Sequence, residues 1–200
     1  MIFSNINVNL FRSFNSLAGE NIILDKIMIF TARYLIYTVP IYLLYLWFLS
    51  KNDKEKKASL YIFLAIIISL SIGRMIGLFY YHPRPFMMGL GKELFPHSRE
   101  TSFPSDHATV MFAVSSALFF LKDTKNGIVF FLLSLLVGFA RIFCGVHFPF
   151  DIVGALIVSL VGTSIVFMFK KYLDYLFAKA IYAYDKIISI IFKRKLQLHS

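Results

Sequence analysis

Long apolar stretches separated by short polar ones dominate the chain. A helix needs about 20 mostly apolar residues to cross the hydrocarbon core of a bilayer, so each long stretch predicts one crossing. The predicted crossings are residues 27–49, 58–81, 105–121, 127–144 and 152–169. This pattern predicts an all-α, polytopic membrane protein with a single transmembrane core over residues 27–169.

The two ends of the chain have a different pattern. In residues 1–25, the apolar residues Leu10, Phe11, Phe14 and Leu17 recur at helical spacing between polar ones. They predict a short amphipathic helix on the membrane surface, with a loosely ordered terminus as the alternative. Residues 170–200 mix aliphatic and aromatic residues with lysines and predict a second surface helix. The whole chain, 1–200, is therefore expected to form one membrane-embedded domain.

Composition supports the membrane assignment and limits the partners. Hydrophobic residues make up 58% of the chain and charged residues only 16%, which excludes an ordinary soluble domain. A net charge of +10 in a soluble protein would suggest nucleic acid. Here the basic residues lie mostly between and after the apolar stretches, so they indicate topology and anionic lipid headgroups instead. The single Cys144 excludes an intrachain disulfide.

The lysines also predict the orientation. Loops 51–57 and 122–125 and the tail 170–200 are basic and fall on one side of the predicted membrane. By the positive-inside rule that side, with the carboxy terminus, is cytoplasmic. The polar loop 82–104 and the stretch 141–151 then lie together on the outer side.

Candidate chemistry is concentrated in these two outer segments. Arg141, His147 and Asp151 lie within eleven residues of an otherwise apolar region. His147 and Asp151 are four residues apart, so on a helical turn they share a face. A carboxylate there can hold one ring nitrogen of the histidine and leave the other free to attack. An arginine can bind two oxygens of a phosphate.

Two further segments supply groups that bind anions. Arg84 lies between two prolines, which hold it in a stiff, extended turn. Pro104 precedes a predicted helix start that Ser105 or Asp106 can cap, and the free N–H groups of such a start bind phosphate. His107 falls in the first turn of that helix. Each segment alone is more often structural, but their predicted convergence indicates phosphoryl chemistry.

Together these segments resemble the type-2 phosphatidic acid phosphatase superfamily, whose soluble relatives include vanadium haloperoxidases. The matching motifs are Arg84-Pro85, then Pro104-Ser105-Asp106-His107, then Arg141, His147 and Asp151. Within the superfamily, the residues around these motifs are similar to those of bacterial undecaprenyl-diphosphate phosphatases. The resemblance implies a helical bundle of the acid phosphatase type with five transmembrane helices.

The resemblance also implies a mechanism. His147 is the expected nucleophile, Asp151 the residue that orients it, and His107 the general acid and base. Substrate-binding groups are expected at Arg84, Pro104, Ser105, Asp106 and Arg141, with Lys92, Glu100 and Thr101 as further candidates. One position departs from the family pattern: a lysine expected seven residues before Arg84 is replaced by Gly77.

The implied function is hydrolysis of undecaprenyl diphosphate on the outer face of the bacterial plasma membrane. Its expected partners are a polyprenyl diphosphate and the bilayer, without nucleic acid. Neither a cofactor nor a metal is expected, because several cations and few carboxylates are the reverse of a magnesium site. Phosphatidylglycerophosphate, phosphatidic acid and lipid A phosphate are alternative substrates. A lipid transporter or flippase is the alternative from another class, although it would place its ionisable residues near the bilayer midplane.

Overall fold

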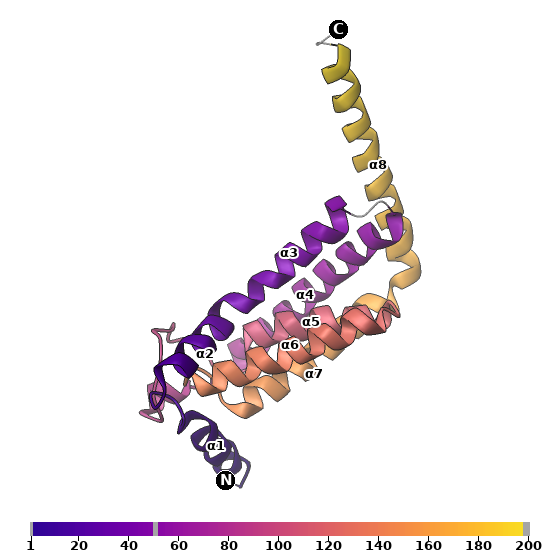
Figure 1. The fold of residues 1–200 in the computed structure, drawn as a ribbon. Coiled ribbons are helices and arrows are strands. Elements are labelled where there is room, and N and C mark those ends of the chain that lie inside the picture. The colour runs from indigo at the N-terminus through magenta and orange to yellow at the C-terminus, as the bar shows by residue number, and fades with distance from the viewer. Residues whose placement is uncertain (1, 50–51, 198–200) are drawn as a thin grey trace.

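The computed structural model describes residues 2–49 and 52–197, and within these ranges every regular element is helical. Met1 of the predicted surface segment and residues 198–200 of the predicted tail lie outside them. The α-helices are α1 (Ile2–Asn15), α2 (Ile22–Tyr34), α3 (Thr38–Leu44), α4 (Asp53–Phe79), α5 (Asp106–Phe120), α6 (Thr124–Phe143), α7 (Pro149–Met168) and α8 (Lys170–Gln197). Figure 1 shows α2 to α7 as a bundle with α1 and α8 at opposite ends.

The first crossing is a composite helix rather than one regular α-helix. It begins at Ile22, earlier than predicted, because the side chain of Asn21 accepts hydrogen bonds from the first backbone N–H groups of α2. A 3-10 turn (Leu35–Tyr37) joins α2 to α3, and a π-helical turn (Tyr45–Leu49) follows α3. Pro40 lies in the first turn of α3, a position at which helices tolerate proline.

Four of the predicted crossings are confirmed as long helices, whereas the third is different. Within the described ranges, four helical segments are long and apolar enough to span a membrane: Ile22–Leu49, Asp53–Phe79, Thr124–Phe143 and Pro149–Met168. The predicted crossing 105–121 is α5, which has only 15 residues. At 1.5 Å per residue it is about 22 Å long, shorter than the hydrocarbon core of about 30 Å.

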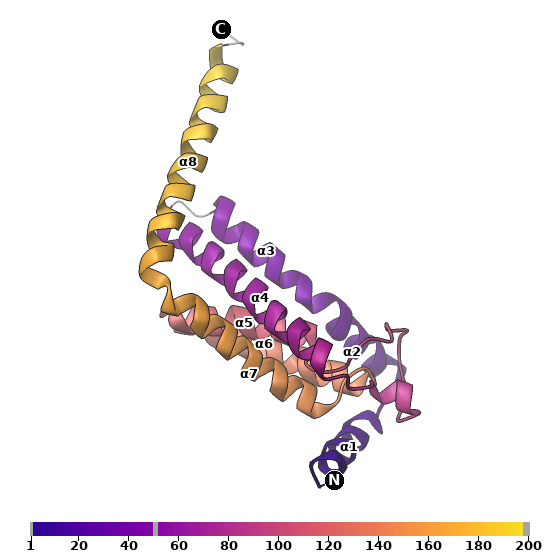
Figure 2. The same cartoon turned by 180° about the vertical axis from the view of Figure 1, so that it is seen from behind.

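Helix α5 is the centre of the bundle. Its residues from Ala108 to Leu118 are all buried, and in Figures 1 and 2 it lies among α4, α6 and α7. A helix that is apolar on every side is typical of such a core position. Small residues let the surrounding helices approach closely: a Cβ on Gly162 of α7 would lie 2.4 Å from Ser69 Oγ on α4.

The two ends of the bundle carry different groups. Helix α1, the loop 80–105 and the connection 144–148 lie at one end, while the turn between α5 and α6 and the start of α8 lie at the other (Figure 2). Helix α8 begins on the bundle, where Tyr184 contacts Trp47 and Asp185 pairs with Lys56 at 2.6 Å, and then projects away from it.

The amino-terminal segment forms a helix, α1, as predicted. This helix also packs against the end of the bundle that carries loop 80–105. Phe11 is fully buried and its ring lies 5.4 Å from that of Phe148. Asn15 donates to Phe143 O at 2.7 Å and to Lys92 O at 2.9 Å, and it accepts from Lys92 N. Asn15 thereby ties the long loop to the end of α6.

Candidate active site

His147 and Asp151 form a buried pair at the start of α7. The helix begins at Pro149, so Asp151 falls in its first turn and accepts the Phe148 N–H at 2.7 Å. That bond turns the carboxylate back toward the preceding segment, and its Oδ2 lies 3.3 Å from His147 Nδ1. Both side chains are only 1% exposed. The carboxylate is therefore placed to hold a proton on Nδ1 and to leave Nε2 with a free lone pair.

Two arginines converge on that lone pair. Arg84 Nη1 lies 3.0 Å from His147 Nε2 and donates to Val146 O, while Arg84 Nη2 donates to Thr101 O at 3.2 Å. Arg141 Nη2 approaches the same imidazole nitrogen to 3.4 Å. Both guanidiniums are buried. An anion bound between them would lie directly in front of Nε2.

The start of α5 completes the arrangement, although not with the hydrogen bond that the sequence predicts. Ser105 occupies the N-cap position, but its side chain makes no cap hydrogen bond. Its backbone N–H instead donates to Asp151 O at 3.3 Å, and its buried Oγ has no partner among the described residues. His107 lies in the first turn of α5, within electrostatic range of Arg84 and Arg141. Ser105 Oγ therefore remains available to a bound anion.

The remaining predicted residues have different positions. Asp106 forms an ion pair with Arg74 at 3.1 Å, which joins α5 to α4. Thr101 contributes through its carbonyl to Arg84, whereas Glu100 lines a small cavity beside that arginine. Lys92 is not brought into the cluster around His147, because its ammonium pairs with the exposed Glu20 at 2.8 Å. Pro104 packs against α4 at Gly73.

The structure gives a steric reason for the departure at Gly77. A Cβ there would lie 2.9 Å from Thr101 Cγ2, closer than such atoms normally approach. The missing side chain therefore leaves room for Thr101, whose carbonyl holds Arg84 and whose Oγ1 accepts from His82 N. A lysine at position 77 and this path of the loop are not compatible without a shift of Thr101.

Three residues of the site do not follow from the sequence motifs. Ser102 donates to Asp151 Oδ2 and lies 3.3 Å from His147 Nδ1. The Nδ1 of His82 is 3.5 Å from the other oxygen of Asp151. The third, His97, lies 2.5 Å from Arg141 through its Nε2. All three belong to loop 82–104, whose irregular backbone carries no periodic signal that places its side chains.

The imidazole of His147 is neutral at physiological pH. Burial lowers its pKa to about 3, and the positive charges of Arg141 and Arg84 act in the same direction, while Asp151 opposes them. A neutral ring keeps its Nε2 lone pair, which is the form that a nucleophile requires. The groups around it are mainly guanidiniums and imidazoles, and this donor set suits a phosphate better than a hard cation.

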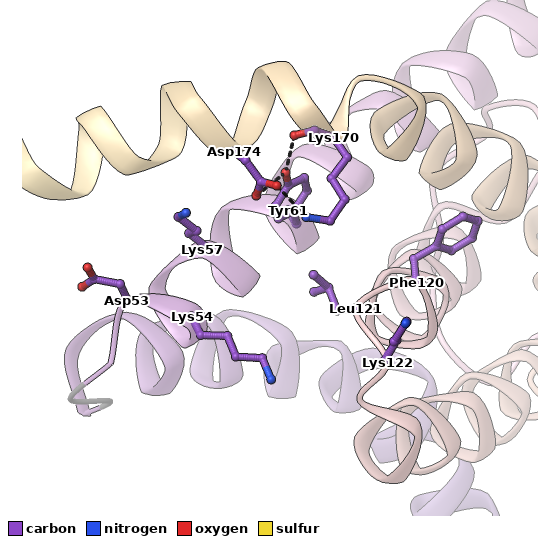
Figure 3. Close-up of a pocket in the computed structure, with 9 residues that line it drawn as sticks. All are labelled: Asp53, Lys54, Lys57, Tyr61, Phe120, Leu121, Lys122, Lys170 and Asp174. Carbon is purple, nitrogen blue, oxygen red and sulfur yellow. Dashed lines mark hydrogen bonds and ion pairs between the residues drawn. The ribbon is translucent and has the colours of Figure 1, made fainter.

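A second cavity, of about 380 Å³, lies at the other end of the bundle (Figure 3). Four lysines line it, and Lys170 there pairs with Asp174, which accepts from Tyr61. Its lining contains no histidine, cysteine or serine. This cavity therefore offers lysines without a histidine, whereas the buried histidine–carboxylate pair and the two buried arginines lie at the end that carries His147.

Comparison with known proteins assigns the family. The model of the PAP2 superfamily matches residues 31–175, which include all three motifs and most of the bundle. The chain belongs to the PAP2 superfamily. Family membership and the buried histidine–carboxylate pair together make it a membrane-embedded lipid phosphatase.

Individual relatives extend the match over nearly the whole chain. Undecaprenyl-diphosphatase BcrC of Bacillus subtilis is 34% identical over 189 residues, which cover 94% of this chain and 97% of that protein. Bacitracin transport permease protein BcrC of Bacillus licheniformis is 30% identical over 84% of this chain and 82% of that protein. The crystal structure of Aquifex aeolicus LpxE superposes with a TM-score of 0.67 at 27% identity, covering 82% of this chain and 95% of that one.

Proposed function

We propose that this protein hydrolyses undecaprenyl diphosphate to undecaprenyl phosphate and inorganic phosphate. The observation that carries the proposal is the convergence of Arg84 and Arg141 on the free nitrogen of the buried, Asp151-held His147. The substrate is inferred from the similarity to undecaprenyl-diphosphatase BcrC over nearly the full length of both chains.

The reaction begins with the terminal phosphate bound between the two guanidiniums. His147 Nε2 attacks the phosphorus, an N–P bond forms, and the bond from phosphorus to the bridging oxygen breaks. His107 gives its proton to the departing lipid phosphate. Asp151 stabilises the positive charge that develops on the imidazole, while Arg84 and Arg141 stabilise the equatorial oxygens.

The second step resolves the phosphohistidine. Water attacks the phosphorus, the N–P bond breaks, and the proton of the water passes to His107, which returns to its starting state. Inorganic phosphate then leaves the site. No step requires a metal ion, because the arginines supply the charge that a divalent cation supplies in other phosphatases.

The site is proposed to face outward. The lysine-lined cavity, at the start of α8, and the basic connection between α5 and α6 lie at the end of the bundle opposite to the connection 144–148, which contains His147. By the positive-inside rule, the lysine-rich end is cytoplasmic and the carboxy terminus with it. A cavity of about 150 Å³ lies beside Arg84 and is lined by Gly77 of α4 together with the charged residues Arg74, Glu100 and Asp106, so it suits a polar headgroup rather than a prenyl chain. In a bacterium such an enzyme recycles the lipid carrier for cell-wall synthesis and raises tolerance to bacitracin.

The test measures phosphate release from four purified lipids, which are undecaprenyl diphosphate, phosphatidylglycerophosphate, phosphatidic acid and lipid A phosphate. Undecaprenyl diphosphate is expected to be the preferred substrate, and activity is expected to persist in excess EDTA. His147→Ala is expected to abolish turnover and to leave no phosphoenzyme after rapid acid-free quenching. A folded His147→Ala protein with near-normal activity would exclude this nucleophile, and a preference for another lipid would exclude the substrate.

Transport is the competing class, suggested by the name of the Bacillus licheniformis relative. Transporters bind their substrates near the bilayer midplane, at breaks between half-helices. The buried ionisable residues here, Arg84, Arg141, His147 and Asp151, instead gather at one end of the bundle. This placement favours the phosphatase.

A further inference from the structure

His97 occupies an unusual position for a residue of an outer loop. Its imidazole is partly buried, its Nε2 lies 2.5 Å from Arg141 Nη2, and its ring centre lies 6.3 Å from that of His147. The loop holds it from both sides: its backbone N–H donates to Glu93 Oε1 at 3.0 Å, and its Nδ1 lies 3.3 Å from Ser98 O. The ring is therefore held toward the site rather than left in solvent.

The contact between His97 and Arg141 requires a neutral imidazole. A guanidinium only donates hydrogen bonds, so His97 Nε2 has to accept, and the ring proton belongs on Nδ1, toward Ser98 O. The surroundings favour this form, because burial and the positive charges of Arg141 and Arg84 together lower the pKa of His97 to about 4. At neutral pH His97 is thus an acceptor for Arg141.

This acceptor sets the orientation of the Arg141 guanidinium. On one side, Arg141 Nη1 donates to Ala32 O of α2 at 3.3 Å. On the other, Nη2 donates to His97 and also lies 3.4 Å from His147 Nε2. The ring of Phe95 lies 5.9 Å from the guanidinium carbon and covers one of its faces. Because Nη2 carries two N–H groups, the one not used by His97 is left for His147 Nε2 or for a phosphate in front of it.

We propose that His97 is a positioning residue, which accepts a hydrogen bond from Arg141 and fixes that guanidinium for binding the terminal phosphate of the substrate. The inference rests on the proposed phosphoryl chemistry and adds a residue outside the three motifs. It also makes the outer loop part of phosphate recognition, because the loop carries the acceptor.

Three variants separate this role from simple packing. His97→Leu keeps much of the volume and removes the acceptor, His97→Gln restores an acceptor oxygen at a similar reach, and Arg99→Gln is the control on the same loop. The measurements are KM and kcat for undecaprenyl diphosphate, the inhibition constant of inorganic phosphate, and thermal unfolding in detergent. Inorganic phosphate probes the anion site without the lipid chain.

For His97→Leu, we expect KM and the inhibition constant of phosphate to rise about tenfold, the usual effect of losing one hydrogen bond to a charged group, with a smaller change in kcat. His97→Gln is expected to recover most of the loss, and Arg99→Gln to match the unmodified protein. Unchanged constants in a folded His97→Leu protein would overturn the proposal, as would a His97→Gln protein as impaired as His97→Leu. Neither result touches the proposed function, which fails only if His147→Ala remains active or another lipid is preferred.

Discussion

Replacing Asp151 by asparagine removes one negative charge from the centre of the site and preserves the size of the side chain. In the structure, Asp151 Oδ2 accepts from the Phe148 N–H and from the Ser102 hydroxyl, and it lies 3.3 Å from His147 Nδ1. An amide can keep the bond to Phe148 only by turning its oxygen toward that N–H. The amide then cannot supply the charge that balances an imidazolium, so the reaction loses its main electrostatic support.

The size of the loss follows from the distance. A full positive charge on the imidazole at 3.3 Å from the carboxylate gains about 5 kcal/mol at an effective dielectric constant of about 20. Each 1.36 kcal/mol corresponds to about a tenfold change in rate, so the largest expected fall in kcat is about 10³- to 10⁴-fold. KM is expected to change little, because Asp151 faces Nδ1, on the side of the ring away from the two arginines.

The assay is phosphate release in detergent micelles, with thermal unfolding to establish that the variant is folded. Asp174→Asn makes the same chemical change at the other end of the bundle, where Asp174 pairs with Lys170, and it is expected to leave turnover unchanged. If a folded Asp151→Asn protein retained kcat within tenfold of the original, the electrostatic role assigned to Asp151 would be wrong. A large rise in KM with normal kcat would also contradict it, because the carboxylate would then act on binding.

Two further predictions concern pH and packing. Because burial lowers the pKa of His147 to about 3, below the ordinary value of about 6.5, the proposed nucleophile stays neutral in the folded protein as the pH falls through 6. Single-turnover rates should therefore not fall between pH 7 and 5 as they would if His147 became protonated near pH 6.5. The contribution of His147 to folding stability is fully present above about pH 6.5 and declines as the pH falls from there toward 3. A tenfold loss of rate by pH 6 would contradict this prediction. Gly162→Ala places a Cβ 2.4 Å from the Oγ and 2.8 Å from the Cα of Ser69. This overlap between α7 and α4 should lower the free energy of unfolding by about 1–3 kcal/mol. An unchanged denaturation midpoint would show that the two helices can separate freely.

Hydropathy was sufficient to locate the helices, because burial in lipid and burial in protein select the same apolar residues. It does not separate these two environments: the stretch 105–121 has the apolar pattern of a crossing, and in the structure it forms α5, a short helix enclosed by its neighbours. The observed helix boundaries also differ from the predicted ones where a capping residue fixes the helix start. Asn21 starts α2 five residues earlier than the apolar pattern indicated.

The convergence of the motif residues could be predicted in part because some of them are close in the sequence. His147 and Asp151 are four residues apart, and the start of α7 between them brings their side chains within 3.3 Å. The loop residues could not be found in the same way. His97 and Ser102 reach the site through a path set by tertiary contacts, such as the hydrogen bonds of Asn15 to Lys92, and no local pattern records those contacts.

The shortness of α5 has a consequence for how a substrate meets the catalytic groups. A helix of about 22 Å, enclosed by longer helices, cannot reach both interfaces of a hydrocarbon core of about 30 Å. At least one of its ends therefore lies below the membrane interface. With the recessed tip at His107, a lipid anchored by its hydrocarbon tail would present its headgroup to the enzyme without being lifted out of the leaflet. The substrate would then enter the site laterally within the leaflet, and the small, water-soluble product would be released into the aqueous phase.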